Sequence, residues 1–142
     1  MIQFISQTDF KIKNKNILKK WIKSVIIFNN KKVGDISFLF LSDEQLLDIN
    51  KKYLSHDYFT DVITFDYTEN NLVSGDIFVS IDRVKENANE FNVTFKDEFL
   101  RVMIHGVLHL LEFDDKTDEQ KKIVRSLEDK YKSSDLLNNF SL

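Results

Sequence analysis

The sequence of 142 residues contains no cysteine and no proline, and it has only three glycines. Without cysteine the chain can form neither disulfides nor thiolate metal sites, so any metal must be held by nitrogen and oxygen ligands. No apolar run approaches the roughly 20 residues that cross a bilayer, and the first residues lack the apolar segment of a secretory signal. We therefore expect a cytoplasmic protein with no membrane partner.

The rest of the composition is ordinary for a globular protein, with 42% hydrophobic and 30% charged residues. Thirteen phenylalanines supply much of the volume of a core. We find no repeat, no low-complexity linker and no change in composition that would mark a second domain. The sequence therefore predicts a single domain over residues 1–142.

Positive charge is concentrated at the N-terminal end. Residues 1–32 hold eight lysines and one acid, Asp9, which gives them a net charge of +7; the total of -3 then leaves -10 for the remainder. A basic segment on an acidic protein can attract a polyanion locally. A lysine-rich helix face that only meets solvent explains the pattern equally well.

Hydrophobic spacing predicts strands interleaved with helices. Strands are expected at 2–5, 36–41, 62–67 and 76–81, and turn-forming residues at 68–75 indicate a hairpin between the last two. Helices are expected from about 16 to 28, after Ser42, from about 82 to 91, after Thr94 and after Thr117. Ser42 with Gln45 and Thr117 with Gln120 have the spacing of capping boxes. This order of elements predicts an α/β or α+β sandwich with one small sheet.

Two of the three histidines, His105 and His109, lie four residues apart in a helix that is apolar on nearly every side. Four residues is just over one helical turn, so both imidazoles project from the same face and can reach one divalent ion. A third ligand can come from the following turn, where Asp114 and Asp115 lie. Three ligands with a position left for water are typical of catalytic zinc sites. The alternative is a pair of core histidines, which would bind no metal.

The residue after the first histidine is Gly106, where metalloproteases with the HExxH motif have their glutamate base. This difference argues against peptidase chemistry of that kind. Glycine costs a helix about 1 kcal/mol relative to alanine. Gly106 therefore either lets another backbone or a substrate come close, or lets the helix pack tightly on a strand.

The segment from His105 to Asp115 resembles the signature of the YbeY family of bacterial endoribonucleases, His-Gly-x-Leu-His-Leu-x-Gly-Tyr-Asp-His. The positions that match outright are His105, Gly106, Leu108, His109, Leu110 and Asp114. Two other stretches are similar to family segments and occur in the same order, Tyr53 to Phe65 and Gly75-Asp76-Ile77.

The resemblance implies an α+β fold, an α/β sandwich in which a single four-stranded mixed sheet packs with about five helices. It implies one zinc ion per chain and metal-dependent cleavage of phosphodiester bonds in single-stranded RNA. It also implies ribosomal RNA and the small ribosomal subunit as partners, in maturation of the 16S rRNA 3′ end and in ribosome quality control.

The third ligand of the family signature is a histidine, and Asp115 stands at that position. A carboxylate is a competent zinc ligand, so we expect His105, His109 and Asp115 to hold the metal and to act in catalysis through it. Asp114 and Glu112 are alternatives for the third ligand. Glu112 also replaces the signature glycine, which alters the turn that delivers this ligand.

A further departure concerns the family's functional arginine, which corresponds to Leu54. His56, two residues on, and the N-terminal lysines are the candidates to replace its positive charge beside a phosphate. We expect Asp61 or Asp57 to accept a hydrogen bond from a ligand imidazole, with capping of a strand or loop as the alternative.

Two other functions fit the same residues. A different metallohydrolase would use the same metal on another substrate. A ribosome-associated binding module would bind ribosomal components with weak or lost catalysis, and Leu54 is the residue that favours this alternative.

Overall fold

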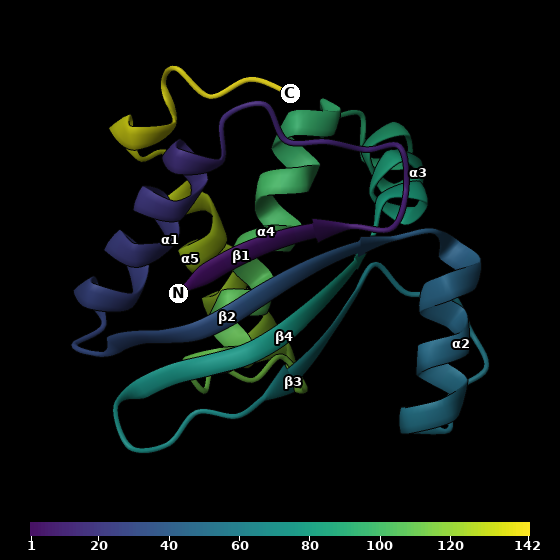
Figure 1. Ribbon diagram of the computed structural model, residues 1–142, viewed down its shortest axis with the longest axis horizontal. Helices are drawn as coiled ribbons and strands as arrows, with labels where there is room; N and C mark the ends of the chain where they lie inside the picture. The colour runs from purple at the N-terminus through teal and green to yellow at the C-terminus, as the bar shows by residue number, and fades with distance from the viewer.

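The computed structural model describes residues 1–142, and its strands form one sheet in the order β1-β2-β4-β3 (Figure 1). The strands are β1 (Ile2–Ser6), β2 (Lys32–Leu41), β3 (Val62–Asp66) and β4 (Leu72–Ser80). β2 pairs in parallel with both β1 and β4, whereas β3 runs antiparallel to β4. The sheet is therefore mixed, and the predicted hairpin joins β3 to β4.

The five helices are α1 (Lys15–Phe28), α2 (Asp43–Leu54), α3 (Ile81–Phe91), α4 (Phe95–Leu110) and α5 (Asp118–Lys132). Both predicted capping boxes are present, at Ser42 before α2 and at Thr117 before α5. They satisfy backbone N–H groups that lack partners inside the helix, and so fix where each helix begins. One turn of 3₁₀ helix follows at Asp135–Leu137. None of these helices combines the length and the apolar character needed to cross a membrane.

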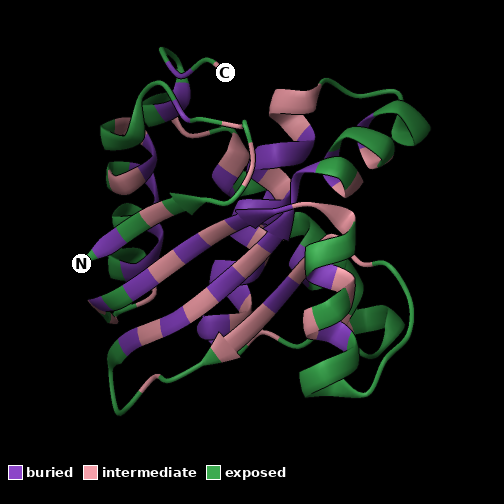
Figure 2. Cartoon of the chain, turned by 45° about the vertical axis from the view of Figure 1, so that its right-hand side comes forward, coloured by how far each residue is buried: buried purple, intermediate pink, exposed green.

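The two faces of the sheet are covered differently. α1 and α4 pack on one face, α5 packs behind α4, and the main hydrophobic core lies between these helices and the strands. α2 covers part of the other face, where Leu41, Leu46 and Ile63 form a smaller cluster. Buried and less buried residues alternate along the strands in Figure 2, as expected for a sheet with two unlike faces. The predicted α+β fold with a four-stranded mixed sheet and five helices is confirmed.

Two strands are longer than their hydrophobic runs. β2 begins at Lys32 rather than at Ile36, and β4 begins at Leu72 rather than at Asp76. These extra residues pair with each other, Lys32 with Leu72 and Val33 with Val73. Pairing between segments about 40 residues apart leaves no mark on the local hydrophobic pattern, so the sequence did not indicate it.

Candidate metal centre and the pocket around it

α4 and the turn after it bring the three predicted ligands together. His105 Nε2 lies 3.0 Å from His109 Nε2 and 3.3 Å from Asp115 Oδ2. His109 Nε2 is 3.9 Å from the same carboxylate oxygen. The ligand atoms of the three residues lie within 4.8 Å of one another, in a group that includes neither Asp114 nor Glu112.

The turn that returns Asp115 to the helix has a defined backbone geometry. The N–H of Phe113 donates to the Leu108 carbonyl and that of Glu112 to the His109 carbonyl, both at 3.0 Å. This pair of hydrogen bonds is a Schellman motif, which requires a left-handed residue just after the helix. Glu112 has φ of 70° and meets that requirement. The turn therefore keeps the backbone form that a glycine would adopt.

Glu112→Gly should raise the free energy of unfolding by about 1 kcal/mol. A residue with a side chain costs about 1–2 kcal/mol in the left-handed region, and the greater freedom of glycine in the unfolded chain offsets part of the gain. Urea denaturation of the metal-free protein measures the change. Glu112→Ala is the control, because it keeps the Cβ and should give no increase. A glycine variant no more stable than the alanine variant would contradict strain at this position.

A buried carboxylate orients the first histidine. His105 Nδ1 donates a hydrogen bond to Glu128 Oε2 at 2.7 Å, and Glu128 is 2% exposed. With its proton on Nδ1, His105 presents the lone pair of Nε2 toward His109 and Asp115. This carboxylate–histidine pairing is the usual support of a metal-bound imidazole.

The two acids expected in the orienting role lie elsewhere. Asp61 lines the pocket, where its carboxylate accepts a hydrogen bond from Asn87 Nδ2 at 3.3 Å. Asp57 is an exposed loop residue whose carboxylate pairs with Lys51 Nζ at 3.4 Å, and it is not among the residues that line the pocket. Neither side chain makes a hydrogen bond to a ligand histidine.

Glu128 was missed because it comes from α5, 23 residues after His105. A signal was nevertheless present in the sequence. Glu128 lies on the same stripe of α5 as the buried residues Val124 and Tyr131. An acid on the apolar side of an amphipathic helix is expected to have a buried partner, because an unpaired buried charge is costly.

Arg101 is at the centre of a charged cluster behind the ligands. Its guanidinium pairs with Glu98 and lies 3.5 Å from Glu128 Oε1 and 3.8 Å from Asp61 Oδ2. Burial lowers the pKa of Arg101, but the hydrogen bond and charge of Glu98, together with the other two carboxylates, raise it well above its usual value. Arg101 therefore stays charged and balances acids that would otherwise repel one another.

The pKa values of the two histidines shift in opposite directions. Burial lowers the pKa of His105, but the hydrogen bond and charge of Glu128 and the charge of Asp115 outweigh it, and the net shift is upward. Burial and the neighbouring His105 lower the pKa of His109. Burial raises the pKa of Asp61, against the charges of Arg101 and His105. Glu128 and Asp115 thus favour a positive charge on His105, whereas burial and the neighbouring His105 favour the neutral form of His109.

Gly106 is explained by packing. A Cβ at this position would lie 2.7 Å from Ile77 Cγ2, on β4. Of the two alternatives from the sequence, the structure shows the close approach of the helix to a strand.

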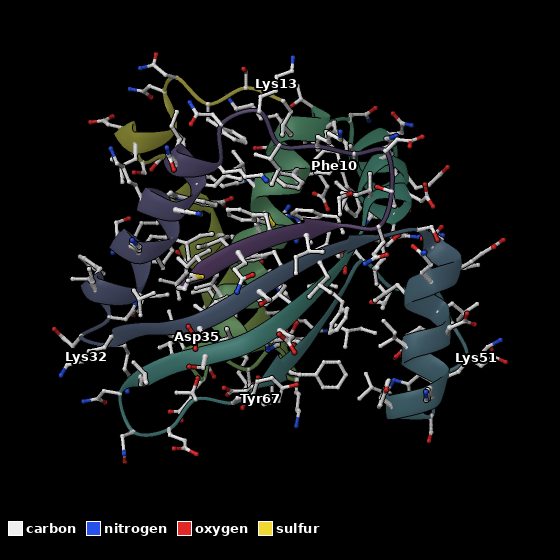
Figure 3. The ribbon with its side chains drawn as sticks, viewed as in Figure 1. Phe10, Lys13, Lys32, Asp35, Lys51 and Tyr67 are labelled. Atoms are coloured by element: carbon white, nitrogen blue, oxygen red, sulfur yellow. The ribbon has the colours of Figure 1, made fainter.

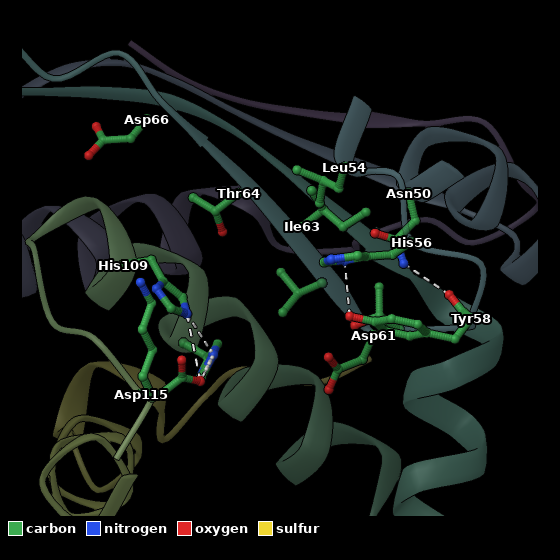
Figure 4. A pocket seen from close by; sticks show the side chains of 14 residues that line it. Asn50, Leu54, His56, Tyr58, Asp61, Ile63, Thr64, Asp66, His109 and Asp115 are labelled. Carbon is green, nitrogen blue, oxygen red and sulfur yellow. Dashed lines mark hydrogen bonds and ion pairs between the residues drawn. The ribbon is translucent and has the colours of Figure 1, made fainter. Parts of the chain in front are cut away.

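The ligands open onto a pocket of about 670 Å³. His56 and Tyr58, from the loop after α2, lie across this pocket from His109 and Asp115 (Figure 4). Leu54 also lines it, and no arginine does. The only lysine in the lining is Lys116, and none of the lysines of residues 1–32 takes part. The structure thus brings His56 to the site and leaves the N-terminal lysines away from it.

The donor set fits a divalent metal ion. Zinc takes nitrogen and oxygen ligands at about 2.0–2.2 Å in a tetrahedral arrangement, which places neighbouring ligand atoms roughly 3.3 Å apart. The three separations here are 3.0, 3.3 and 3.9 Å. Two imidazoles and one carboxylate are also a ligand set found in catalytic zinc sites with an open position.

Comparison with known proteins agrees with this geometry. A family model described as Endoribonuclease YbeY matches residues 3–134. Endoribonuclease YbeY of Flavobacterium johnsoniae is 46% identical over 129 residues, which cover 91% of this chain and 93% of the relative. The protein of the same name from Flavobacterium psychrophilum is 47% identical over 129 residues, with 91% and 92% covered. The solution structure of TM1509 from Thermotoga maritima has 31% sequence identity and a TM-score of 0.60, and the match covers 96% of this chain and 95% of that one.

Proposed function

The chain belongs to the YbeY family of endoribonucleases, and from this premise we propose that it cleaves single-stranded RNA at the pocket beside His105, His109 and Asp115. It is a metal-dependent hydrolase of RNA phosphodiester bonds that acts in ribosomal RNA processing. We place the site there because three potential ligand atoms lie within 4.8 Å of one another at the wall of a pocket.

The proposed metal is one Zn²⁺ per chain, held by His105, His109 and Asp115. When bound, such an ion supplies a Lewis acid that polarises a phosphoryl oxygen and favours ionisation of water. Glu128 keeps the Nδ1 proton of His105 in place, so that Nε2 is free to act as a ligand.

Lys116 is proposed to supply the positive charge that Leu54 cannot. It follows the third ligand in the chain, lines the same pocket and makes no ion pair in the structure. An ammonium group in this position attracts the phosphate and stabilises the extra negative charge of the transition state. The N-terminal lysines are not candidates for this role, because none of them lines the pocket.

The proposed partners are ribosomal RNA near the 16S 3′ end and the small ribosomal subunit. A basic surface formed by α1 and the segment just before it supports this proposal; its lysines are Lys11, Lys13, Lys15, Lys19, Lys20 and Lys23. None of them makes an ion pair with an acid, and all but Lys19 are exposed. In Figure 3 the labelled Lys13 lies at the top of the view, well away from Lys51 on α2 at the right.

Neutralising two lysines of this surface should weaken RNA binding and make it less dependent on salt concentration. Each lysine–phosphate contact contributes about 0.7 to the slope of log K against log salt for a single strand. Lys15→Gln with Lys20→Gln should therefore lower the magnitude of that slope by about 1.4, measured by fluorescence anisotropy over a range of salt. Lys85→Gln with Lys122→Gln, on α3 and α5, has the same change in net charge and should leave the slope unchanged. Equal slopes for the two variants would show that the surface does not touch RNA.

The proposed activity is tested with purified protein and one ribosomal RNA fragment, offered as a single strand and as a duplex. We expect about one bound divalent metal ion per chain, cleavage of the single strand only, loss of cleavage with a chelator and recovery with Zn²⁺. Elemental mass spectrometry and gel assays measure these results. Binding of RNA without cleavage by the metal-loaded protein would instead identify a binding module. Better recovery with Mn²⁺ or Fe²⁺ would overturn the assignment of zinc.

A further inference from the structure

The loop between α2 and β3 presents a pair of aromatic rings at the wall of the pocket. The rings of His56 and Tyr58 are stacked, with centroids 5.1 Å apart and planes inclined by 21°. The Tyr58 hydroxyl is hydrogen-bonded to His56 Nδ1 at 3.0 Å. Tyr58 is 56% exposed, His56 is exposed as well, and both line the same pocket as the three metal ligands.

The fold does not require these rings where they are. Neither residue belongs to either hydrophobic cluster, and leaving aromatic surface in water sacrifices the free energy of burying it. The loop is nevertheless held in place. Asn50, which is 1% exposed, donates from Nδ2 to the Tyr58 carbonyl at 2.9 Å, and Ser55 ends α2 in a left-handed conformation. The rings are thus fixed in an arrangement that stays open to solvent.

We propose that the His56–Tyr58 pair is a stacking platform for one unpaired RNA base next to the phosphate that is cleaved. Flat aromatic and imidazole faces bind unpaired bases in proteins that recognise single strands, and one stacked base commonly strengthens binding about tenfold or more. The pair, joined by its own stacking and hydrogen bond, loses little freedom when a base arrives. This inference rests on the proposed function, because it takes RNA as the substrate.

The layout of the pocket fits a nucleotide. Its volume of about 670 Å³ lies inside the range of roughly 300–1,000 Å³ for small-ligand sites. His109 and Asp115 lie on one side of the pocket and the ring pair lies on the other, so phosphate and base would have separate walls (Figure 4). Lys116, which also lines the pocket, directly follows Asp115 in the chain. The faces of a base inside a duplex are covered by its neighbours. The platform therefore favours single strands over duplexes.

Tyr58→Ala should raise KM for single-stranded RNA about tenfold and change kcat by less than twofold, because stacking is the same in the substrate complex and in the transition state. Tyr58→Phe keeps a stacking face and should stay within about threefold of wild type. Tyr67→Ala is the matched control, because Tyr67 is 58% exposed and does not line the pocket (Figure 3 labels this residue). Equal KM values for the Tyr58→Ala and Tyr67→Ala variants would overturn the proposal.

A modified substrate gives a second test that does not depend on folding of a variant. An abasic nucleotide is moved along a short single-stranded RNA on both sides of the cleaved bond. One position should weaken binding to wild type about tenfold and have little effect on Tyr58→Ala. Equal losses for the two proteins at every position would overturn the platform.

A binding experiment without cleavage separates the platform from the proposed function. The metal is removed with a chelator, and RNA that carries 2-aminopurine at the position found above is added. Stacking on the rings is then measured as quenching of the 2-aminopurine fluorescence. Quenching by wild type but not by Tyr58→Ala supports the platform even if no RNA is cut. Normal cleavage by a protein that shows no quenching leaves the function standing and removes the platform.

Discussion

His109→Ala should lose its bound metal and cleave single-stranded RNA on the order of 1,000 times more slowly than wild type, since a metal centre supplies several kcal/mol of transition-state stabilisation. The variant leaves two ligands, His105 and Asp115, which lie 3.3 Å apart and cannot complete a three-ligand site. The fold should survive, because the His109 side chain is partly exposed and its one hydrogen bond is to His105, another of the predicted ligands. Metal content and single-turnover cleavage rates, measured on the same preparation, check the result.

Two neighbouring acids provide the control for this experiment. Asp115→Ala should behave like His109→Ala, whereas Asp114→Ala should keep its metal and its activity, because Asp114 is outside the ligand group. The opposite pattern would move the third ligand to Asp114. Undiminished cleavage by metal-free His109→Ala protein would place the reaction at another site altogether.

Glu128→Ala should weaken metal binding about 10–100-fold, because its carboxylate orients His105 through the Nδ1 hydrogen bond. It should also lower the free energy of unfolding by about 3 kcal/mol, since removing one member of a buried ionic cluster leaves Arg101 with a lost partner. Competition with a chromophoric chelator measures the metal affinity, and urea denaturation of the metal-free protein measures the stability.

Glu128→Gln separates orientation from charge. Its amide oxygen can still accept the Nδ1 hydrogen bond, so we expect metal affinity between those of wild type and Glu128→Ala. The nitrogen chemical shifts of His105 report which ring nitrogen carries the proton. They should indicate the Nδ1–H form in wild type and in the glutamine variant, and a mixture in the alanine variant. Wild-type metal affinity in Glu128→Ala would contradict an orienting role.

The sequence predicted well those features that depend on residues close together along the chain. The capping boxes at Ser42 and Thr117 depend on side chains three residues apart, and the meeting of His105 with His109 follows from the period of one helix. The strands of the sheet were found from their apolar runs. The first residues of β2 and β4 were not predicted, because they pair with each other across the chain and not with their neighbours in sequence.

Contacts between distant segments account for what the sequence left out of the site. Glu128 reaches His105 only after α5 has packed on α4, and Arg101 then joins acids from three segments. Position in the fold also narrows the candidates for the positive charge beside the phosphate, since His56 and Lys116 both line the pocket. The lysines of residues 1–32 are numerous, but none of them lines the pocket, whereas Lys116 reaches it from the turn after α4.

The left-handed backbone at Glu112 has a consequence for how relatives of this chain are recognised. The signature prescribes a glycine there, yet the Schellman hydrogen bonds hold the same bend with a long acidic side chain in its place. A search with a signature that requires glycine at this position would reject this chain, although His105, His109 and Asp115 come together in its structure. A signature could instead require a positive φ at that position and any side chain able to bind a metal at its last position. Such a signature would retain divergent members that a fixed sequence pattern excludes.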